Sequence, residues 1–165
     1  MRVALLSVVI FLAAVNTANG QGNPRDFGRD AMRERLEHYA RVQKEVYESV
    51  LLRWKSAAER DDVGALAKFY DESATYFPPG LPFVQTRAAV RDYFANFLGK
   101  VGDVSVSLID FGTSGDLAYV TAGMSFYVLN HSEPGRKLTR TDLMVLRRRT
   151  SGDWQILTHF SRDES

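Results

Sequence analysis

Apolar and polar residues alternate along the last third of the chain, in three stretches at 104–111, 117–129 and 139–161. A Thr-Ser-Gly-Asp segment at 150–153 interrupts the last stretch, and Trp154 starts the alternation again. Successive side chains of a β-strand point to opposite faces of a sheet, so this pattern indicates strands that are buried on one face. We therefore expect one antiparallel sheet, backed by the helices of the first half.

The first half of the chain shows helical spacing instead. Residues 26–60 contain no proline. Apolar side chains recur at helical spacing, at Met32, Leu36, Tyr39, Val46, Val50 and Trp54, and the polar Gln43 fills the slot between Tyr39 and Val46. This spacing predicts one long amphipathic helix, or two helices with a break. A helix of this length measures about 50 Å. We therefore expect its charged first half, 29–44, to project from the domain or to pack on a second subunit.

Shorter elements fill the middle of the chain. Asp61 and Asp62 are suited to cap a helix at 63–70, and Thr86 is suited to cap a helix at 87–98. A short strand is expected at 73–77. Turns are expected at 78–80, at 112–116, where the glycines serve backbone geometry, and at 133–135.

The first twenty residues differ from the rest. Arg2 is followed by a nearly unbroken apolar run at 3–14, and Ala18-Asn19-Gly20 provides the small residues of a cleavage site. This pattern is typical of a secretory signal peptide, and the apolar run is shorter than a membrane span requires. An uncleaved anchor is the alternative. In either case we expect the folded part to be secreted or otherwise extracytoplasmic, without a stable membrane span.

Charge and cysteine content narrow the classes of function. The chain has 21 basic and 20 acidic residues, and loss of residues 1–20 removes only Arg2 from this count. A nearly neutral chain lacks the concentrated positive surface that nucleic acids require, so we expect no nucleic-acid partner. The sequence has no cysteine, which excludes disulfides, thiolate metal sites and thiol catalysis. No cofactor motif is present, and we expect no cofactor.

Asn130-His131-Ser132 is an acceptor sequence for N-glycosylation, next to the turn expected at 133–135. A glycan on Asn130 would be tolerated at an exposed hairpin tip, and the motif also occurs by chance.

Several short strings resemble, in order and spacing, the secreted type of SnoaL-like domain, in the nuclear transport factor 2-like (ketosteroid isomerase-like) superfamily. The strings lie between residues 50 and 162, at 54–58, 61–63, 72–76, 78–80, 86–90, 114–120 and 152–156. The resemblance divides the chain into a signal peptide at 1–20, an N-terminal helical extension at 21–48 and a SnoaL-like domain at 49–165. Thr86 stands where the family usually has glycine, which leaves the geometry of that turn open.

The resemblance implies an α+β fold, in which a cone-shaped, curved antiparallel sheet wraps around a long N-terminal helix. This cystatin-like roll leaves a pocket at its open end, and it commonly dimerises through the other face of the sheet. We therefore expect a homodimer. The fold hosts isomerases, cyclases, dehydratases, assembly domains and carriers, so it does not name a reaction.

Ketosteroid isomerases of this fold use a carboxylate base, assisted by a tyrosine and a protonated acid. The resemblance aligns the position of the base with Pro78 and that of the tyrosine with Trp54. Proline cannot accept a proton, which argues against isomerase chemistry of that type.

Asp142 and His159 are the candidate catalytic pair. A hairpin around 151–152 would bring them to one sheet face as neighbours, where a histidine held by a carboxylate could act as a general base. The alternative is that the pair satisfies polar groups in a half-buried sheet, which we favour because no second acid or nucleophile is evident. The three histidines, His38, His131 and His159, lack a short ligand spacing, so no metal site is expected.

Basic residues cluster at 136–137, 140 and 147–149. They could form an edge for an anionic polysaccharide or lipid headgroup. Alternation sends successive arginines to opposite faces, which favours a solvated strand end instead.

Aromatic residues are abundant on the elements that surround the pocket in this fold. We expect the pocket lining to include Trp54, Tyr70, Tyr76 and Phe94, together with Asp142 and His159. The sequence favours a pocket for a small, largely apolar ligand without catalysis. The alternatives are a lyase or isomerase that uses His159 and Asp142, and a dimeric interaction or assembly module built on the first helix.

Overall fold

The computed structural model describes residues 24–98, 101–130 and 133–164. Contacts divide the chain into two units, 1–34 and 35–165, and the sheet with the helices that pack on it belongs to the second unit. The predicted signal peptide at 1–20 lies outside the described residues, as do two of the three residues of the glycosylation motif. Within the described part, no helix is both long enough and apolar enough to cross a bilayer.

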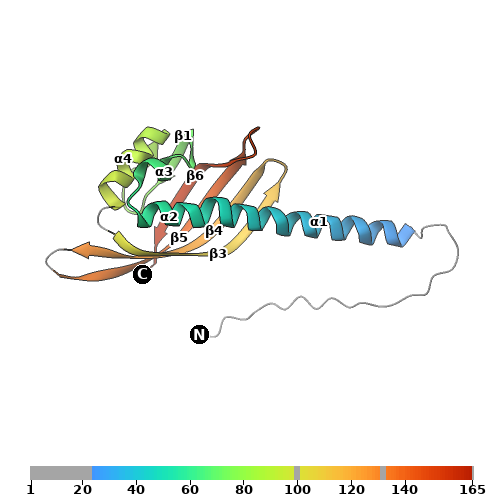
Figure 1. Cartoon of the computed structure of the whole chain (residues 1–165), viewed down its shortest axis with the longest axis horizontal. Helices are drawn as coiled ribbons and strands as arrows, with labels where there is room; N and C mark the ends of the chain where they lie inside the picture. Colours follow the sequence, from blue (N-terminus) through green and yellow to red (C-terminus); the bar gives the residue numbers. More distant parts are fainter. Residues whose placement is uncertain (1–23, 99–100, 131–132, 165) are drawn as a thin grey trace. The chain divides into compact units, whose positions relative to one another are not determined.

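The long helix predicted at 26–60 is confirmed, and it is continuous. It comprises α1 (Pro24–Val46), a π-helical segment η1 (Tyr47–Leu52) and α2 (Arg53–Glu59) (Figure 1). Its buried positions include Val42, Val46, Val50, Trp54 and Ala58. A four-residue spacing drifts by about 40° per step around a regular α-helix. The wider π turn takes up part of that drift and keeps these side chains on the face toward the sheet.

The expectation that residues 29–44 project or meet a second subunit is wrong for the end of that segment. Val42 is 4% exposed, and the Tyr39 hydroxyl donates a hydrogen bond to the Phe111 carbonyl oxygen at 2.5 Å. Glu45, the residue that follows this segment, forms an ion pair with Arg148. The helix therefore packs on the sheet of its own chain from Tyr39 onward.

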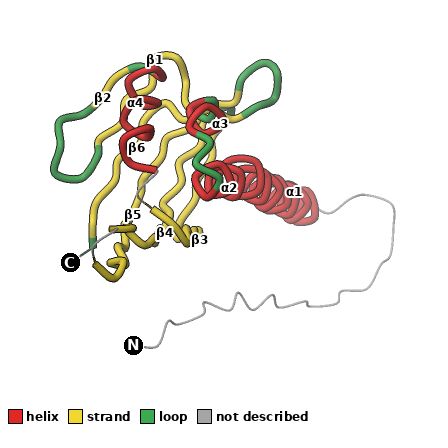
Figure 2. The backbone as a smooth tube through the Cα atoms, turned by 60° about the vertical axis from the view of Figure 1, so that its left-hand side comes forward, coloured by secondary structure: helices red, strands yellow, loops and turns green. Residues whose placement is uncertain are grey.

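Six strands form a single curved sheet in the described residues: β1 (Tyr70–Phe77), β2 (Val84–Gln85), β3 (Val101–Ser114), β4 (Leu117–Asn130), β5 (Glu133–Arg148) and β6 (Trp154–Asp163). Their order is β2-β1-β6-β5-β4-β3. Neighbours are antiparallel except β1 and β6, which are parallel. Figure 2 shows the strands bending around the side on which the helices lie. The expected α+β architecture is confirmed.

Several boundaries differ from the prediction. The helix predicted at 63–70 ends earlier, because α3 spans Val63–Ala67 and Tyr70 already belongs to β1. The turn predicted at 133–135 is wrong, since these residues begin β5 and extend the hairpin with β4. The strand β2 was not predicted, because a strand of two residues gives no periodic signal in the sequence. The connection of β3 to β4 needs only residues 115–116, where Gly115 adopts a φ of +61°.

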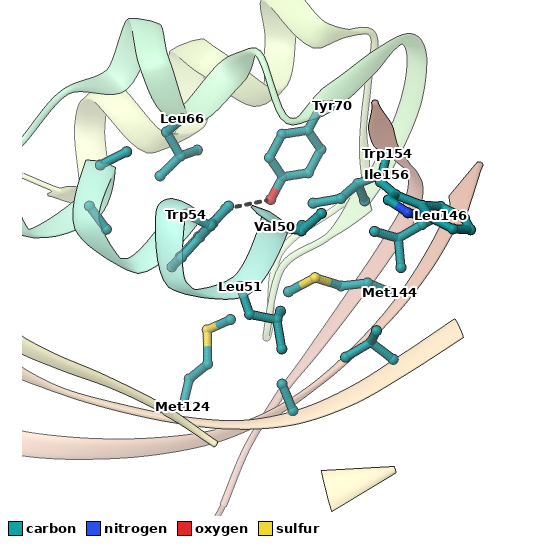
Figure 3. Close-up of a cluster of buried hydrophobic side chains, with 14 of the residues drawn as sticks. Val50, Leu51, Trp54, Leu66, Tyr70, Met124, Met144, Leu146, Trp154 and Ile156 are labelled. Atoms are coloured by element: carbon teal, nitrogen blue, oxygen red, sulfur yellow. Dashed lines mark hydrogen bonds between the residues drawn. The ribbon is translucent and has the colours of Figure 1, made fainter. Parts of the chain in front are cut away.

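The core lies between the long helix and the concave face of the sheet. Side chains of η1 and α2 meet those of β4, β5 and β6, among them Val50, Leu51, Trp54, Met124, Met144, Leu146 and Ile156 (Figure 3). In β4 and β5 the even-numbered residues are buried between 118 and 126 and between 140 and 146, as the alternation predicted. This concave face therefore determines which residues can line an interior cavity.

Thr86 is the N-cap residue of α4 (Arg87–Phe97), at the turn where the family usually has glycine. Its φ is +83° with ψ at 147°, a region that favours glycine, while its hydroxyl oxygen accepts a hydrogen bond from the Ala89 amide at 3.3 Å. Such backbone strain in a β-branched residue costs about 1–3 kcal/mol. The turn thus keeps the glycine-type conformation without glycine.

We predict that Thr86→Gly stabilises the protein by about 1 kcal/mol, because relief of strain exceeds the lost cap and the added chain entropy. Thr86→Ala retains the strain and loses the cap, so it destabilises by about 1 kcal/mol. Urea unfolding followed by circular dichroism measures both changes. Destabilisation by the glycine variant would contradict this account of the turn.

Candidate functional site

An interior cavity lies between the concave face of the sheet and the helices α2 and α4. Its volume is about 20 Å³, which is room for about one water molecule. Its lining comprises Trp54, Ala58, Tyr76, Phe94, Phe97, Leu98, Val101, Val104, Met124, Phe126, Arg140, Asp142, His159 and Ser161. The lining is therefore apolar except along one strip on β5 and β6.

Aromatic rings form the helical wall of the cavity. The ring of Phe94 packs edge-on against Trp54 with centroids 5.7 Å apart, and it stacks with Tyr76 at 5.4 Å. Phe97 meets Phe126 of the sheet edge-on at 5.3 Å. Edge-to-face and stacked pairs of this kind fix ring orientations in a core. A ligand larger than water requires some of these rings to move.

The polar strip arises from the register of two neighbouring strands. Asp142 is paired with Ser161, and Met144 is paired with His159, so Asp142 and His159 are diagonal neighbours. All the polar members of the strip are on the concave face, because they lie two residues apart on each strand. Arg140, Asp142, His159 and Ser161 are between 1% and 8% exposed.

Hydrogen bonds join the strip to the helical wall in one chain. The Trp54 indole Nε1 donates to the Tyr70 hydroxyl at 3.3 Å, and that hydroxyl lies 2.8 Å from His159 Nδ1. His159 Nε2 lies 3.2 Å from Asp142 Oδ1, which also accepts a hydrogen bond from the Ser161 hydroxyl. Figure 3 shows the bond between Trp54 and Tyr70 at one end of the chain.

The donors and acceptors of this chain are consistent with one assignment of protons. Tyr70 accepts from Trp54 and donates to Nδ1 of His159, so the neutral imidazole carries its proton on Nε2 and donates it to Asp142. Both nitrogens of His159 are then occupied by protein groups. Among the described residues, the hydrogen bonds to Asp142 end on Oδ1. Oδ2 is therefore the oxygen left for a bound molecule.

Arg140 borders the cavity without neutralising Asp142. Its guanidinium lies 5.0 Å from the ring centroid of Phe97 and 4.9 Å from that of Phe126, and its Nε donates to Asp163 Oδ1 at 2.6 Å. The predicted solvated strand end is thus wrong for Arg140, which is 8% exposed. Arg140 lies two residues before Asp142 on β5, so the two side chains share a face of the sheet. This spacing could have predicted that Arg140 lines the cavity.

The structure brings five of the six predicted lining residues to the cavity. Trp54, Tyr76, Phe94, Asp142 and His159 line it, while Tyr70 lies behind them and bonds Trp54 and His159. Ser161 also lines the cavity and was not predicted, although it lies two residues after His159 on the same face. Their roles in binding or catalysis remain predictions. Across residues 24–98, 101–130 and 133–164, no three acidic or histidine side chains are grouped to hold a metal ion.

Two buried phenols lie at the site, Tyr70 within the series of hydrogen bonds and Tyr76 in the lining of the cavity. Burial raises the pKa of the Tyr70 phenol well above its ordinary value, and the pKa of Tyr76 is raised in the same way. Both hydroxyl groups are therefore neutral at physiological pH. Tyr70 can donate its proton in a hydrogen bond, but it is a poor acid.

We predict that folding stability falls as the pH rises above about 10, the ordinary pKa of tyrosine. A raised pKa means that the folded state holds the proton more tightly, so its stabilisation is complete below that pH and is lost above it. Each phenol contributes a slope of about 1.4 kcal/mol per pH unit. Urea unfolding between pH 8 and about 11.5 should show a shallower fall for Tyr70→Phe, whereas the exposed control Tyr127→Phe should match the wild type. Equal slopes in all three proteins would contradict the assignment.

Comparisons with known proteins agree with this architecture. A ketosteroid isomerase-like protein from Erwinia carotovora atroseptica has a TM-score of 0.66 at 21% identity, covering 73% of this chain and 95% of that one. A candidate dehydratase of the nuclear transport factor 2-like family, from Streptomyces avermitilis, has a TM-score of 0.60 at 21% identity, covering 74% and 99%. A candidate scytalone dehydratase from Novosphingobium aromaticivorans has a TM-score of 0.66 at 14% identity, covering 75% and 85%.

At these identities, the similarity to solved structures establishes the fold but not an activity. No curated protein sequence matches the chain. The model of the SnoaL-like domain matches residues 51–155, the segment that contains the whole helical wall of the cavity and most of the sheet. The chain belongs to the SnoaL-like domain family.

Proposed function

We propose that the chain binds a small, largely apolar molecule in the interior cavity, with one hydrogen-bond donor of that molecule directed at Asp142. The main support is the composition of the lining. Its walls are aromatic, and its polar strip contains the Asp142 carboxylate, whose hydrogen bonds to the described residues end on Oδ1 and leave Oδ2 free. Binding sites for small molecules combine apolar walls with a few placed polar groups in this way.

The size of the cavity sets a condition on this proposal. A volume of about 20 Å³ accommodates water alone, so a ligand has to displace side chains of the wall. Phe97 is only partly buried and lies at the end of α4. Rotation of this ring away from Phe126 and Arg140 would enlarge the cavity, so we place the entry on the side of α4.

Binding of 2-naphthol and of naphthalene tests the proposed role of Asp142, because the two probes share an apolar body and only 2-naphthol carries a donor. A hydrogen bond to a charged acceptor is worth about 1.5–3 kcal/mol. We expect the wild type to bind 2-naphthol at least tenfold more tightly than naphthalene in isothermal titration calorimetry. Asp142→Asn should reduce that preference, and the exposed control Asp110→Asn should retain it.

The absence of binding by either probe, together with the absence of any co-purifying small molecule in native mass spectrometry, would contradict the proposal. If Asp142→Asn kept the full preference for 2-naphthol over naphthalene, a group other than Asp142 would accept the hydrogen bond of the ligand, and the proposed role of Asp142 would be wrong.

A second candidate function is a lyase or isomerase activity that uses His159 and Asp142. The continuous hydrogen-bond chain from Trp54 to Ser161 favours it, because Asp142 Oδ2 could take up a proton from a bound molecule while His159 holds the carboxylate in place. The occupation of both imidazole nitrogens favours binding over catalysis. Screening of small-molecule mixtures for loss of water or isomerisation separates the two functions. Turnover by the wild type that disappears in both His159→Ala and Asp142→Asn would establish the enzyme.

We also propose that two copies associate through the outer face of the sheet. Apolar side chains are exposed on adjacent strands there, with Leu143 at 43%, Tyr119 at 41% and Phe160 at 48%. Leu143 is paired with Phe160 and with Thr121, so these side chains form a continuous patch across β4, β5 and β6. A second copy presents the same patch, and self-association through it would bury both.

We predict that wild-type protein is dimeric in light scattering at micromolar concentration and that Leu143→Asp is monomeric with unchanged circular dichroism. The control Leu81→Asp changes an apolar residue that is 60% exposed in the loop between β1 and β2, and it should remain dimeric. A monomeric wild type would contradict the proposal.

A further inference from the structure

A second and larger hollow is lined by other residues of the long helix than those that line the cavity. It has a volume of about 650 Å³ and is open to solvent, between α2, α3 and the turn that joins β5 to β6. We call it the basic cleft. Its lining comprises Glu45, Ser49, Arg53, Ser56, Ala57, Arg60, Ala65, Lys68, Phe69, Arg149, Gly152, Asp153, Trp154 and Gln155. It shares no lining residue with the interior cavity.

The charges of the basic cleft are unbalanced. Its lining includes four basic side chains, Arg53, Arg60, Lys68 and Arg149, and two acidic ones. Within the described part of the chain, none of these four basic groups takes part in an ion pair. Arg60 instead donates a hydrogen bond to the Ser56 hydroxyl at 2.5 Å, and the Arg53 guanidinium lies over the Phe69 ring. Neither contact removes a charge, so the cleft keeps positive charge for an anion.

The two acidic groups are already engaged by neighbours. Glu45 pairs with Arg148, and its other carboxylate oxygen accepts a hydrogen bond from the Trp154 indole at 3.2 Å. Asp153 accepts one from the Ser151 hydroxyl at 3.0 Å. Arg148 neutralises Glu45, so Asp153 leaves a single negative charge against the four basic side chains.

Two buried polar atoms of the cleft lack a partner among the described residues. They are Gln155 Oε1 and Ser49 Oγ. The Gln155 side chain belongs to a residue only 8% exposed, and its amide nitrogen reaches the Lys68 carbonyl oxygen at 3.5 Å. A buried acceptor without a partner costs about 1–3 kcal/mol, so such groups call for an explanation. Ligand hydroxyl groups, which donate and accept, would satisfy either atom once its side chain turns toward the cleft.

We propose that the basic cleft binds a small hydroxylated anion, of the class of sugar acids and sugar phosphates. The anionic group lies among Arg149, Lys68 and Arg53, while hydroxyl groups bond to Gln155 and Ser49. The ring of Phe69, half-buried at the wall, supports the Arg53 guanidinium, which lies 5.9 Å from the ring centroid. The volume of about 650 Å³ is within the range of small-molecule sites.

The charge of the chain as a whole favours a small anion over a polymer. The formal net charge is only +1, so the positive groups of the cleft are a local feature and not part of an extended basic surface. Nucleic acids and long anionic polysaccharides require such an extended surface. The site is also independent of the ligand proposed for the interior cavity.

Isothermal titration calorimetry with four probes tests the proposal on the full chain. We expect glucuronate and glucose 6-phosphate to bind with a Kd tighter than about 1 mM, a value typical of a weak specific site. Glucose, which lacks the charge, and inorganic phosphate, which lacks the ring hydroxyls, should each bind at least tenfold more weakly. Absence of binding by both anionic sugars would overturn the proposal, and so would equal affinity for glucose 6-phosphate and inorganic phosphate.

Matched variants locate the binding in the cleft. Arg149→Ala and Lys68→Ala should each weaken glucose 6-phosphate binding about tenfold or more, because charge-assisted hydrogen bonds are the strong ones. Arg147→Ala removes the same charge from an exposed residue of β5 that does not line the cleft, so its affinity should remain within about twofold of wild type. Equal effects at 147 and 149 would show unspecific charge attraction and would overturn the site.

Gln155→Met tests the role of the buried amide separately from charge. Its side chain has a similar length and no hydrogen-bonding amide, so the variant should fold with unchanged or higher stability. It should reduce the preference for glucose 6-phosphate over inorganic phosphate at least threefold. Full retention of the preference in this folded variant would overturn the assignment of Gln155 as the acceptor of a ligand hydroxyl.

Discussion

The burial of the Asp142 carboxylate is the constraint on which the concave face depends. A carboxylate that is 1% exposed is costly unless hydrogen bonds compensate it, and both Ser161 and His159 supply them to the same oxygen. His159 in turn is held by Tyr70, and Tyr70 by Trp54 on the long helix. A series of hydrogen bonds therefore joins the helix to the sheet, in addition to apolar packing. The position of the helix depends on that of the sheet through both.

The alternation of β5 and β6 made the juxtaposition of Asp142 and His159 predictable, because register and side-chain period together decide which residues share a face. The same reasoning could have found Ser161 and Arg140, two positions away on each strand. Charge alone misassigned Arg140 to a solvated edge, since sequence does not show that Phe97 and Phe126 enclose its guanidinium. The π turn, β2 and the size of the cavity depend on tertiary packing, which leaves no periodic signal in the sequence.

One helix separates two hollows of different chemistry. Trp54 and Ala58 face the interior cavity, whereas Arg53, Ala57 and Arg60 line the basic cleft. Neighbouring residues of a helix point about 100° apart, so a single turn can serve both sides. The cavity is small, is lined by aromatic rings and ends in a carboxylate, while the cleft is large and positively charged. The fold thereby offers an apolar site and an anion site without a shared side chain.

The protonation of His159 tests the account of the cavity most directly. Long-range ¹H–¹⁵N correlation spectra of the imidazole, assigned with a His159→Gln variant, distinguish the two neutral tautomers. At neutral pH the account predicts a protonated Nε2 and an unprotonated Nδ1, because Tyr70 donates to Nδ1 and Asp142 accepts from Nε2. A proton on Nδ1 and none on Nε2 would reverse the direction of the chain. His159 would then not donate a hydrogen bond to Asp142, and the account would be contradicted.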